Sequence, residues 1–198
     1  MNERNIIAVV RFDDKQTSLD FSNACIQGGI NVLEVITIRN KSFEIISELS
    51  EFEDIVVGAG TVLNVDSAER AYNAGAKFIV SPHTDKNIID FTKSKGLISI
   101  AGAYTSSEIV NAYNLGADFV KIFPASLGGP EYVKAIKEAL PFVKILVTGG
   151  VNFQNFLDFI SAGASLIGVS TALTGKGDSF DKDVVLKNSK NFLSSINL

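Results

Sequence analysis

Short apolar runs and amphipathic stretches alternate along the whole chain. The apolar runs are rich in Val, Ile and Phe, as is typical of strands buried on both faces of a parallel sheet. We predict eight of these strands, at Ile6–Arg11, Asn31–Ile36, Ile55–Gly58, Phe78–Ser81, Leu97–Ala101, Phe119–Phe123, Val143–Thr148 and Ser165–Ser170. Apolar positions with helical spacing lie between them, in Thr17–Gln27, Val65–Ala74, Asp85–Lys95, Ser106–Asn114, Pro130–Leu140 and Asn155–Ala162. These helical ranges are examples, and eight strands that are each followed by a helix indicate a parallel α/β protein.

Glycine recurs where a predicted helix ends and the next strand begins. Gly75, Gly116 and Gly163 each precede an alanine, and Gly28-Gly29 stands at the equivalent place after the first helix. Glycine at a helix C-terminus accepts left-handed backbone geometry. This recurrence favours a closed (β/α)8 TIM barrel over a doubly wound sheet, and no Gly-x-Gly-x-x-Gly follows the first strand, which argues against a dinucleotide site. We predict one such domain over residues 1–198.

Composition narrows the classes of function. The net charge of -4 argues against nucleic acid or an anionic membrane as the main partner, so an anionic substrate must be held by local donors. One cysteine, Cys25, excludes an internal disulfide, and one histidine, His83, makes a histidine-based metal centre or triad hard to build. We therefore expect chemistry without a metal or cofactor. No segment resembles a signal peptide or reaches membrane-span length, so we expect a cytoplasmic protein.

Lys121 lies inside an apolar strand, and it is the most informative residue of the chain. Phe119, Lys121 and Phe123 share one face of the predicted strand because side chains alternate with a period of two. Removal from water disfavours the charged form of an amine, and an uncharged amine forms Schiff bases with carbonyl substrates. The alternative is a lysine at a strand end that points into solvent. We favour the catalytic interpretation.

A second charged residue, Glu34, stands within the apolar run of the second predicted strand. Burial of a carboxyl group suits general acid/base work, and the alternative is a structural ion pair with Lys121 or an arginine. Because an ion pair buried for stability alone brings little net gain, we favour the functional interpretation.

Other candidates lie at the predicted C-terminal strand ends, where barrel active sites form. Gly149 and Gly150 follow the seventh strand, and Gly168 and Ser170 close the eighth. Small residues there let backbone N–H groups reach an anion, so we predict an anion site. Thr61, after the third strand, has a hydroxyl for a substrate carboxylate or, equally, for a helix cap. His83 is expected at the rim, without a catalytic role.

Six segments in this order resemble the 2-keto-3-deoxy-6-phosphogluconate (KDPG) and 4-hydroxy-2-oxoglutarate (KHG) aldolases. They are Gly28–Val35, Val57–Val62, Phe78–Pro82, Val120–Ala125, Val147–Val151 and Gly168–Ser170, and together they span nearly the whole chain. The resemblance implies a trimeric class I aldolase, built as a (β/α)8 barrel, that needs no metal and acts on pyruvate and phosphorylated keto acids.

The resemblance also implies roles for individual residues. It implies that Lys121 is the Schiff-base lysine and Glu34 the acid/base group. Thr61 matches a residue near the pyruvate carboxylate, and Phe123 matches an aromatic residue of the pocket. Gly149, Gly150 and Ser170 match phosphate-binding positions.

Three positions depart from the family pattern. The family commonly reads Glu-Val-Thr-Leu-Arg, but Glu34 and Arg39 are one residue further apart here. In a regular strand this spacing puts Arg39 on the face opposite Glu34, so Arg39 binds substrate only if a bulge or loop re-aims it, and Arg11 is expected to share that role. Ala101 and Val147 each stand where the family has a proline.

The expected reaction is reversible cleavage of a 2-keto-4-hydroxy acid to pyruvate and an aldehyde, either glyceraldehyde 3-phosphate or glyoxylate. Two alternatives stay open at this point. One is a non-catalytic barrel that binds sugar-acid phosphates, suggested by the longer spacing between Glu34 and Arg39. The other is a phosphate-binding barrel that catalyses isomerisation or epimerisation without an imine.

Overall fold

In the computed structural model, which describes residues 6–175 and 180–196, eight parallel strands close into a barrel. Each strand pairs with its neighbours in chain order, and β1 pairs with β8. The strands are β1 Ile6–Val10, β2 Val32–Ile36, β3 Val56–Gly60, β4 Phe78–Val80, β5 Ile98–Gly102, β6 Phe119–Ile122, β7 Ile145–Thr148 and β8 Leu166–Val169. The (β/α)8 barrel expected from the sequence is confirmed.

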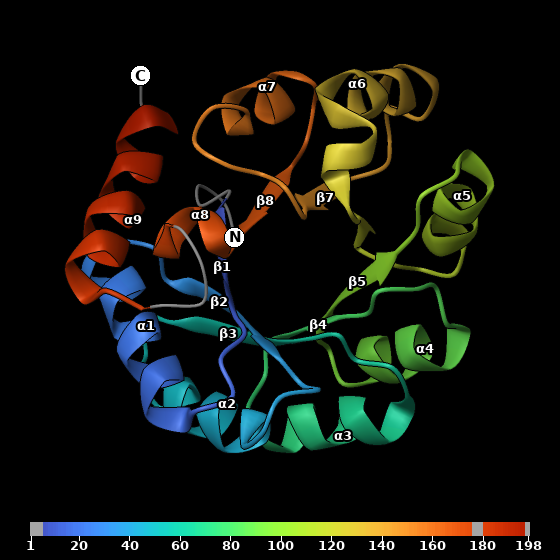
Figure 1. Ribbon diagram of the computed structural model, residues 1–198. Coiled ribbons are helices and arrows are strands. Elements are labelled where there is room, and N and C mark those ends of the chain that lie inside the picture. The colour runs from blue at the N-terminus through green and yellow to red at the C-terminus, as the bar shows by residue number, and fades with distance from the viewer. Residues whose placement is uncertain (1–5, 176–179, 197–198) are drawn as a thin grey trace.

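Helices surround the strands as an outer ring, with the C-terminal helix beside the N-terminal one (Figure 1). Their bounds are α1 Lys15–Gln27, α2 Ser42–Ser50, α3 Val65–Asn73, α4 Lys86–Ser94, α5 Ser106–Asn114, η1 Ala125–Leu127, α6 Gly129–Ala139, α7 Phe156–Ser161, α8 Thr171–Thr174 and α9 Lys182–Ile196. None of the described helices is long and apolar enough to cross a lipid bilayer.

Polar side chains cap the N-termini of several of these helices, a few residues after a strand ends. Asp14 accepts hydrogen bonds from the Thr17 backbone and hydroxyl at the start of α1, and Asn64 and Asp85 cap α3 and α4. At α5, Thr105 and Glu108 form a reciprocal capping box. Each cap satisfies backbone N–H groups that have no partner within their helix. The caps fix how each chain segment leaves the barrel mouth and enters the outer layer.

Two apolar layers result from the alternation of side chains along the strands. Residues that point outward from the strands pack against the helices and form the larger core. Residues that point inward fill the lower barrel, among them Ile7, Phe78, Ile100 and Leu146. Gly58 makes room for the largest of these, because a Cβ atom there would lie 2.4 Å from the Phe78 ring. The barrel floor is therefore closed, and a site can open at one end only.

The observed elements differ from the predicted ones mainly at their ends. For example, the strand predicted over Ile55–Gly58 runs from Val56 to Gly60, and the one predicted over Val143–Thr148 begins at Ile145. The helical stretches with predicted ranges are all present, and α2, α8 and α9 are helices for which no range is predicted. Helix α9 buries only a few side chains, including Val185 and Phe192. Because many of its other residues are polar, the helical spacing of its apolar residues is hard to recognise in the sequence.

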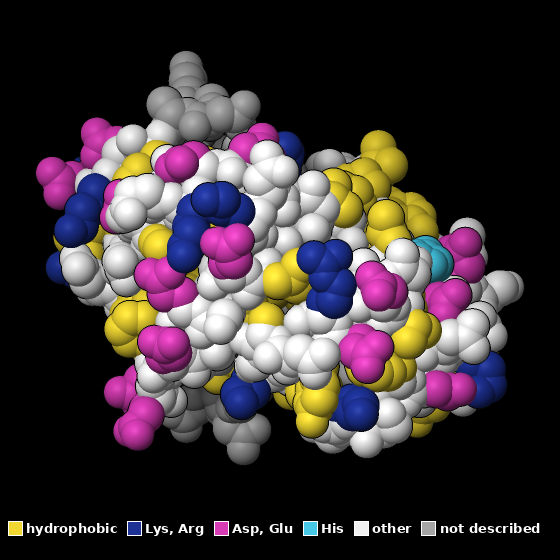
Figure 2. Space-filling view, turned by 90° about the horizontal axis from the view of Figure 1, so that it is seen from below, with side chains coloured by type: hydrophobic (Ala, Val, Ile, Leu, Met, Phe, Trp, Pro, Cys, Tyr) yellow, Lys and Arg dark blue, Asp and Glu magenta, His cyan; other side chains and the backbone are white. Residues whose placement is uncertain are grey.

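Positive and negative side chains are mixed on the surface. Figure 2 shows Lys and Arg side chains interspersed with Asp and Glu on the face seen from below, with apolar side chains between them. No broad field of one sign covers this face, as the small net charge of -4 leads one to expect.

Candidate active site

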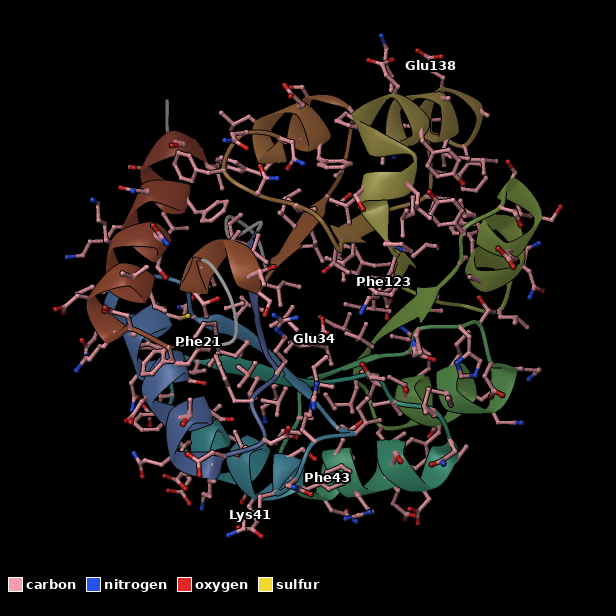
Figure 3. The ribbon with its side chains drawn as sticks, in the orientation of Figure 1. Phe21, Glu34, Lys41, Phe43, Phe123 and Glu138 are labelled. Atoms are coloured by element: carbon pink, nitrogen blue, oxygen red, sulfur yellow. The ribbon has the colours of Figure 1, made fainter. Side chains whose placement is uncertain are left out.

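A buried ion pair joins opposite walls of the barrel. Lys121 of β6 donates from Nζ to Oε1 of Glu34 in β2 at 3.3 Å. The Lys121 side chain is 8% exposed and that of Glu34 is fully enclosed. Glu34 points toward the barrel axis, as Phe123 does from the other side (Figure 3). The structure therefore brings together the two charged residues that stand in apolar strands, although 87 positions separate them along the chain.

Glu34 is held by a close backbone approach from the next strand. Gly60 pairs with Ile36 in the β2–β3 register, and a Cβ atom on Gly60 would lie 2.2 Å from Oε1 of Glu34. Among the described residues, the second carboxylate oxygen, Oε2, has no hydrogen-bond partner. A buried oxygen in that state is suited to accept a proton or a hydrogen bond from a molecule that enters the barrel.

Lys121 opens onto a cavity of about 350 Å³ at the C-terminal ends of the strands. The predicted residues that line it, besides Lys121, are Arg11, Thr61, Phe123, Gly149, Gly150, Gly168 and Ser170. The Phe123 ring lies 5.7 Å from Nζ of Lys121, so one wall beside the amine is aromatic. A cavity of this volume suits a small metabolite.

Thr61 has an unusual backbone conformation in this cavity. Its φ angle is +56°, in the left-handed region that a β-branched residue rarely adopts. Such a conformation costs about 1–3 kcal/mol and persists only where the surrounding structure holds it. In this conformation Thr61 forms part of the cavity lining. It does not cap the helix that follows, because Asn64 is the N-cap of α3.

Two consecutive glycines shape the opposite side of the cavity. Gly149 and Gly150 have φ angles of +84° and +81°. A Cβ atom on Gly149 would lie 2.8 Å from the Phe123 ring, and one on Gly150 would lie 2.4 Å from Cβ of Ser126. Ser170, across the β7–β8 edge, donates its hydroxyl to the carbonyl of Val9 at 2.9 Å. The backbone N–H groups of the glycine loop form a polar end suited to an anion, and the Ser170 hydroxyl can donate to that anion once it releases the Val9 carbonyl.

Comparison with known proteins agrees with this geometry. The family model for "KDPG and KHG aldolase" matches residues 1–187. The chain belongs to the KDPG and KHG aldolase family.

Individual members of this aldolase family are similar over most of the chain. A 2-dehydro-3-deoxy-phosphogluconate aldolase of Treponema pallidum is 32% identical over 79% of this chain and 75% of its own length. A probable 2-dehydro-3-deoxy-6-phosphogalactonate aldolase of Rhizobium meliloti is 31% identical over 88% of this chain and 84% of its own. The solved KDPG aldolase of Legionella pneumophila, captured with pyruvate as a covalent carbinolamine, is 25% identical, with a TM-score of 0.81 over 97% of this chain and 92% of its own.

Two predicted site residues do not line this cavity. Glu34 lies behind Lys121 and contacts its amine, whereas Arg39 lies outside the cavity altogether. It lies in the turn after β2, and its Nη1 atom contacts Oδ2 and Oδ1 of Asp13 at 3.0 and 3.2 Å. Together with Asp13 it lines a neighbouring cavity of about 500 Å³. Because Arg11 lines both cavities, Arg11 and not Arg39 reaches the space in front of Lys121. The extra residue after Glu34 thus leads Arg39 away from the amine.

Several lining residues were not among the predicted site residues. Val9 and Ile36 lie two positions from Arg11 and Glu34, so strand alternation carried a signal for both. The others, Pro82, Thr148, Val151 and Thr171, lie at or after the ends of β4, β7 and β8. His83 contacts the Ser81 hydroxyl through Nδ1 at 3.0 Å and lines a separate, adjacent cavity.

Proposed function

We propose that this chain is a class I aldolase that cleaves a 2-keto-4-hydroxy acid reversibly to pyruvate and an aldehyde. The observation that carries the proposal is the buried contact of 3.3 Å between Nζ of Lys121, which lines a small cavity, and Oε1 of Glu34. An amine that forms an imine and a carboxylate that moves protons are the two groups that this reaction needs.

The reaction begins when Lys121 passes a proton to Glu34 and its neutral amine attacks the C2 carbonyl of the keto acid. Glu34 returns this proton to the hydroxyl of the carbinolamine, which leaves as water and gives a protonated imine. Glu34 takes the proton of the C4 hydroxyl, the C3–C4 bond breaks, and its electron pair moves into the imine to give an enamine while the aldehyde leaves. Protonation of the enamine at C3 and hydrolysis of the imine release pyruvate and restore the lysine.

Apart from the reacting pair, the cavity residues bind the two ends of the substrate in this proposal. Arg11 and Thr61 hold the carboxylate next to the imine carbon. Gly149, Gly150, Gly168 and Ser170 accommodate a terminal phosphate, and Phe123 covers the carbon chain. Fixed placement of both ends holds C2 in reach of the amine, which contributes much of the rate.

The relatives' names favour phosphorylated six-carbon keto acids as the substrate class. The Treponema relative carries the phosphogluconate-derived name and the Rhizobium relative the phosphogalactonate-derived one. These two substrates differ in configuration at C4, so Glu34 and its neighbours decide between them. We propose glyceraldehyde 3-phosphate as the aldehyde product, with glyoxylate from 4-hydroxy-2-oxoglutarate as the alternative for the same site.

A pyruvate-release assay tests the proposed function. Purified protein is assayed without added metal against both phosphorylated epimers and 4-hydroxy-2-oxoglutarate, with Lys121→Arg as the control. We expect release from at least one phosphorylated substrate and none from the variant. Turnover by Lys121→Arg at the wild-type rate would contradict an imine mechanism, and binding of the substrates without release by the wild type would favour a binding protein.

We further propose that the chain acts in the cytoplasm as a homotrimer, as the family resemblance implies. Light scattering on purified protein checks the assembly. We expect a mass three times the chain mass of 21.2 kDa, and a single-chain mass at working concentration would contradict it.

A further inference from the structure

Thr37 makes a small hydrogen-bonded network between the ends of β2 and β3. Its backbone N–H donates to the carbonyl of Gly60 at 2.8 Å. Its hydroxyl lies 3.0 Å from the same carbonyl and 3.2 Å from the carbonyl of Thr61, so one hydroxyl proton is shared between two acceptors. The buried Ser42 at the start of α2 donates its hydroxyl to the Thr37 carbonyl at 3.1 Å. Thr37 therefore ties the β2–α2 turn to the end of β3.

The two carbonyls that Thr37 contacts are those of Gly60 and Thr61, which lie beside Glu34 and in the lining of the Lys121 cavity. Gly60 lies against the Glu34 carboxylate, where a Cβ atom would come within 2.2 Å of Oε1. Thr61 lines the Lys121 cavity in its left-handed conformation. A left-handed threonine needs external contacts to persist, and the Thr37 hydroxyl supplies one directly on the Thr61 carbonyl.

We propose that the Thr37 hydroxyl is a positioning group for the aldolase site, which acts through Thr61 and does not touch the substrate. This inference rests on the proposed function above. Thr37 itself is not among the residues that line the Lys121 cavity. Without the hydroxyl, the Thr61 peptide is free to relax out of its strained conformation and to turn the Thr61 side chain away from the substrate carboxylate.

A valine at position 37 isolates this contribution. Valine keeps the β-branched shape of threonine and puts a methyl group in place of the hydroxyl, so that the donor is lost. The backbone bond from residue 37 to the Gly60 carbonyl does not depend on the side chain, so the barrel edge stays paired. A serine at position 37 retains the donor, and Thr37→Ser is therefore the conservative variant that should restore function.

The test combines steady-state kinetics with borohydride trapping of pyruvate on Lys121 over a range of pyruvate concentrations. We expect Thr37→Val to raise the KM for the keto acid about tenfold, and the half-saturating pyruvate concentration for trapping by a similar factor, the scale of one hydrogen bond to a charged group. The kcat is expected to stay within about threefold of wild type, and Thr37→Ser is expected to behave like wild type.

Two controls separate positioning from general stability. Thr92→Val makes the same substitution at a buried hydroxyl that donates to the Ile88 carbonyl in α4, outside the cavity lining, and is expected to leave KM and trapping unchanged. In a Thr61→Ala background, Thr37→Val is expected to have little further effect on KM, because the two residues act in series.

The outcomes distinguish this inference from the proposed function. If wild-type protein neither turns over substrate nor traps pyruvate, the proposed function is wrong. If wild type is active but Thr37→Val has the KM and trapping curve of wild type, the positioning role is wrong. Equal defects in Thr37→Val and Thr37→Ser, or full additivity with Thr61→Ala, would also overturn it.

Discussion

At the scale of single residues, the account depends on how two charges are buried together. The Lys121–Glu34 pair is enclosed, and removal of one partner from such a pair generally costs about 3–5 kcal/mol, because the other charge is left without compensation. Variants at either position therefore need a folding check before loss of activity is interpreted. A substitution that displaces the Glu34 carboxylate but keeps its charge tests the role of Glu34 more directly.

Gly60→Ala is a change of that kind. The added methyl group would lie 2.2 Å from Oε1 of Glu34, so the carboxylate must shift. We predict a fall in kcat of at least about tenfold for the aldol cleavage, because a displaced base transfers its proton poorly. Kinetics with a circular dichroism check measures this. Wild-type kcat in a folded Gly60→Ala protein would contradict the role given to Glu34.

The two arginines near the mouth are predicted to differ in effect. Arg11 lines the Lys121 cavity, whereas Arg39 is paired with Asp13 in a partly exposed contact. We expect Arg11→Gln to raise the KM for keto acids by about tenfold or more, on the scale of a lost charged hydrogen bond. Arg39→Gln removes an exposed ion pair of the kind worth about 0–1 kcal/mol, so KM and stability should change little. The reverse ranking in the same assay would show that Arg39 turns inward to bind substrate.

At the scale of elements, the burial of the Cys25 thiol depends on how α1 packs against the rest of the molecule. Burial raises the pKa of the Cys25 thiol from 9.0 to about 12. Because the folded state holds this proton more tightly than the unfolded state, its contribution to stability is complete below pH 9 and is lost as the pH rises from about 9 to about 12.

We therefore predict that Cys25 resists alkylation in folded protein at pH 8 and reacts promptly in denaturant. The folded-state pKa of about 12 also predicts that Cys25→Ser removes part of the loss of unfolding free energy between pH 9 and the highest pH at which folding can be measured. Mass spectrometry after timed alkylation and denaturant titrations check both. Rapid labelling of the native protein would contradict the burial of this face of α1.

The elements themselves were predictable to the extent that their signals were local. The helix Ser106–Asn114 was predicted with the bounds that the structure has, since Thr105 and Glu108 form its capping box and Gly116 follows its end. A helix was expected after the second strand, but no range was predicted for α2. It begins after Lys41, which has a φ angle of +55° and makes no side-chain cap, so the usual start signal is missing.

At the scale of the whole molecule, the sequence predicted the barrel and named Lys121 and Glu34 as its two catalytic groups. Their direct contact appeared there only as the alternative of a structural ion pair. The placement of Arg39 could not be predicted in the same way. Its position depends on a turn, and on Asp13 in the loop after β1, which is 26 positions away in sequence and becomes adjacent once β1 pairs with β2. Loop contacts of this kind carry no periodic signal.

The most direct measurement of the central claim is borohydride reduction in the presence of pyruvate, followed by peptide mapping. We predict one pyruvate-derived three-carbon group on Lys121 in wild-type protein and none in folded Lys121→Arg. If folded wild-type protein remains unmodified, or if the group is found on another lysine, Lys121 does not form the imine and the proposed mechanism is wrong.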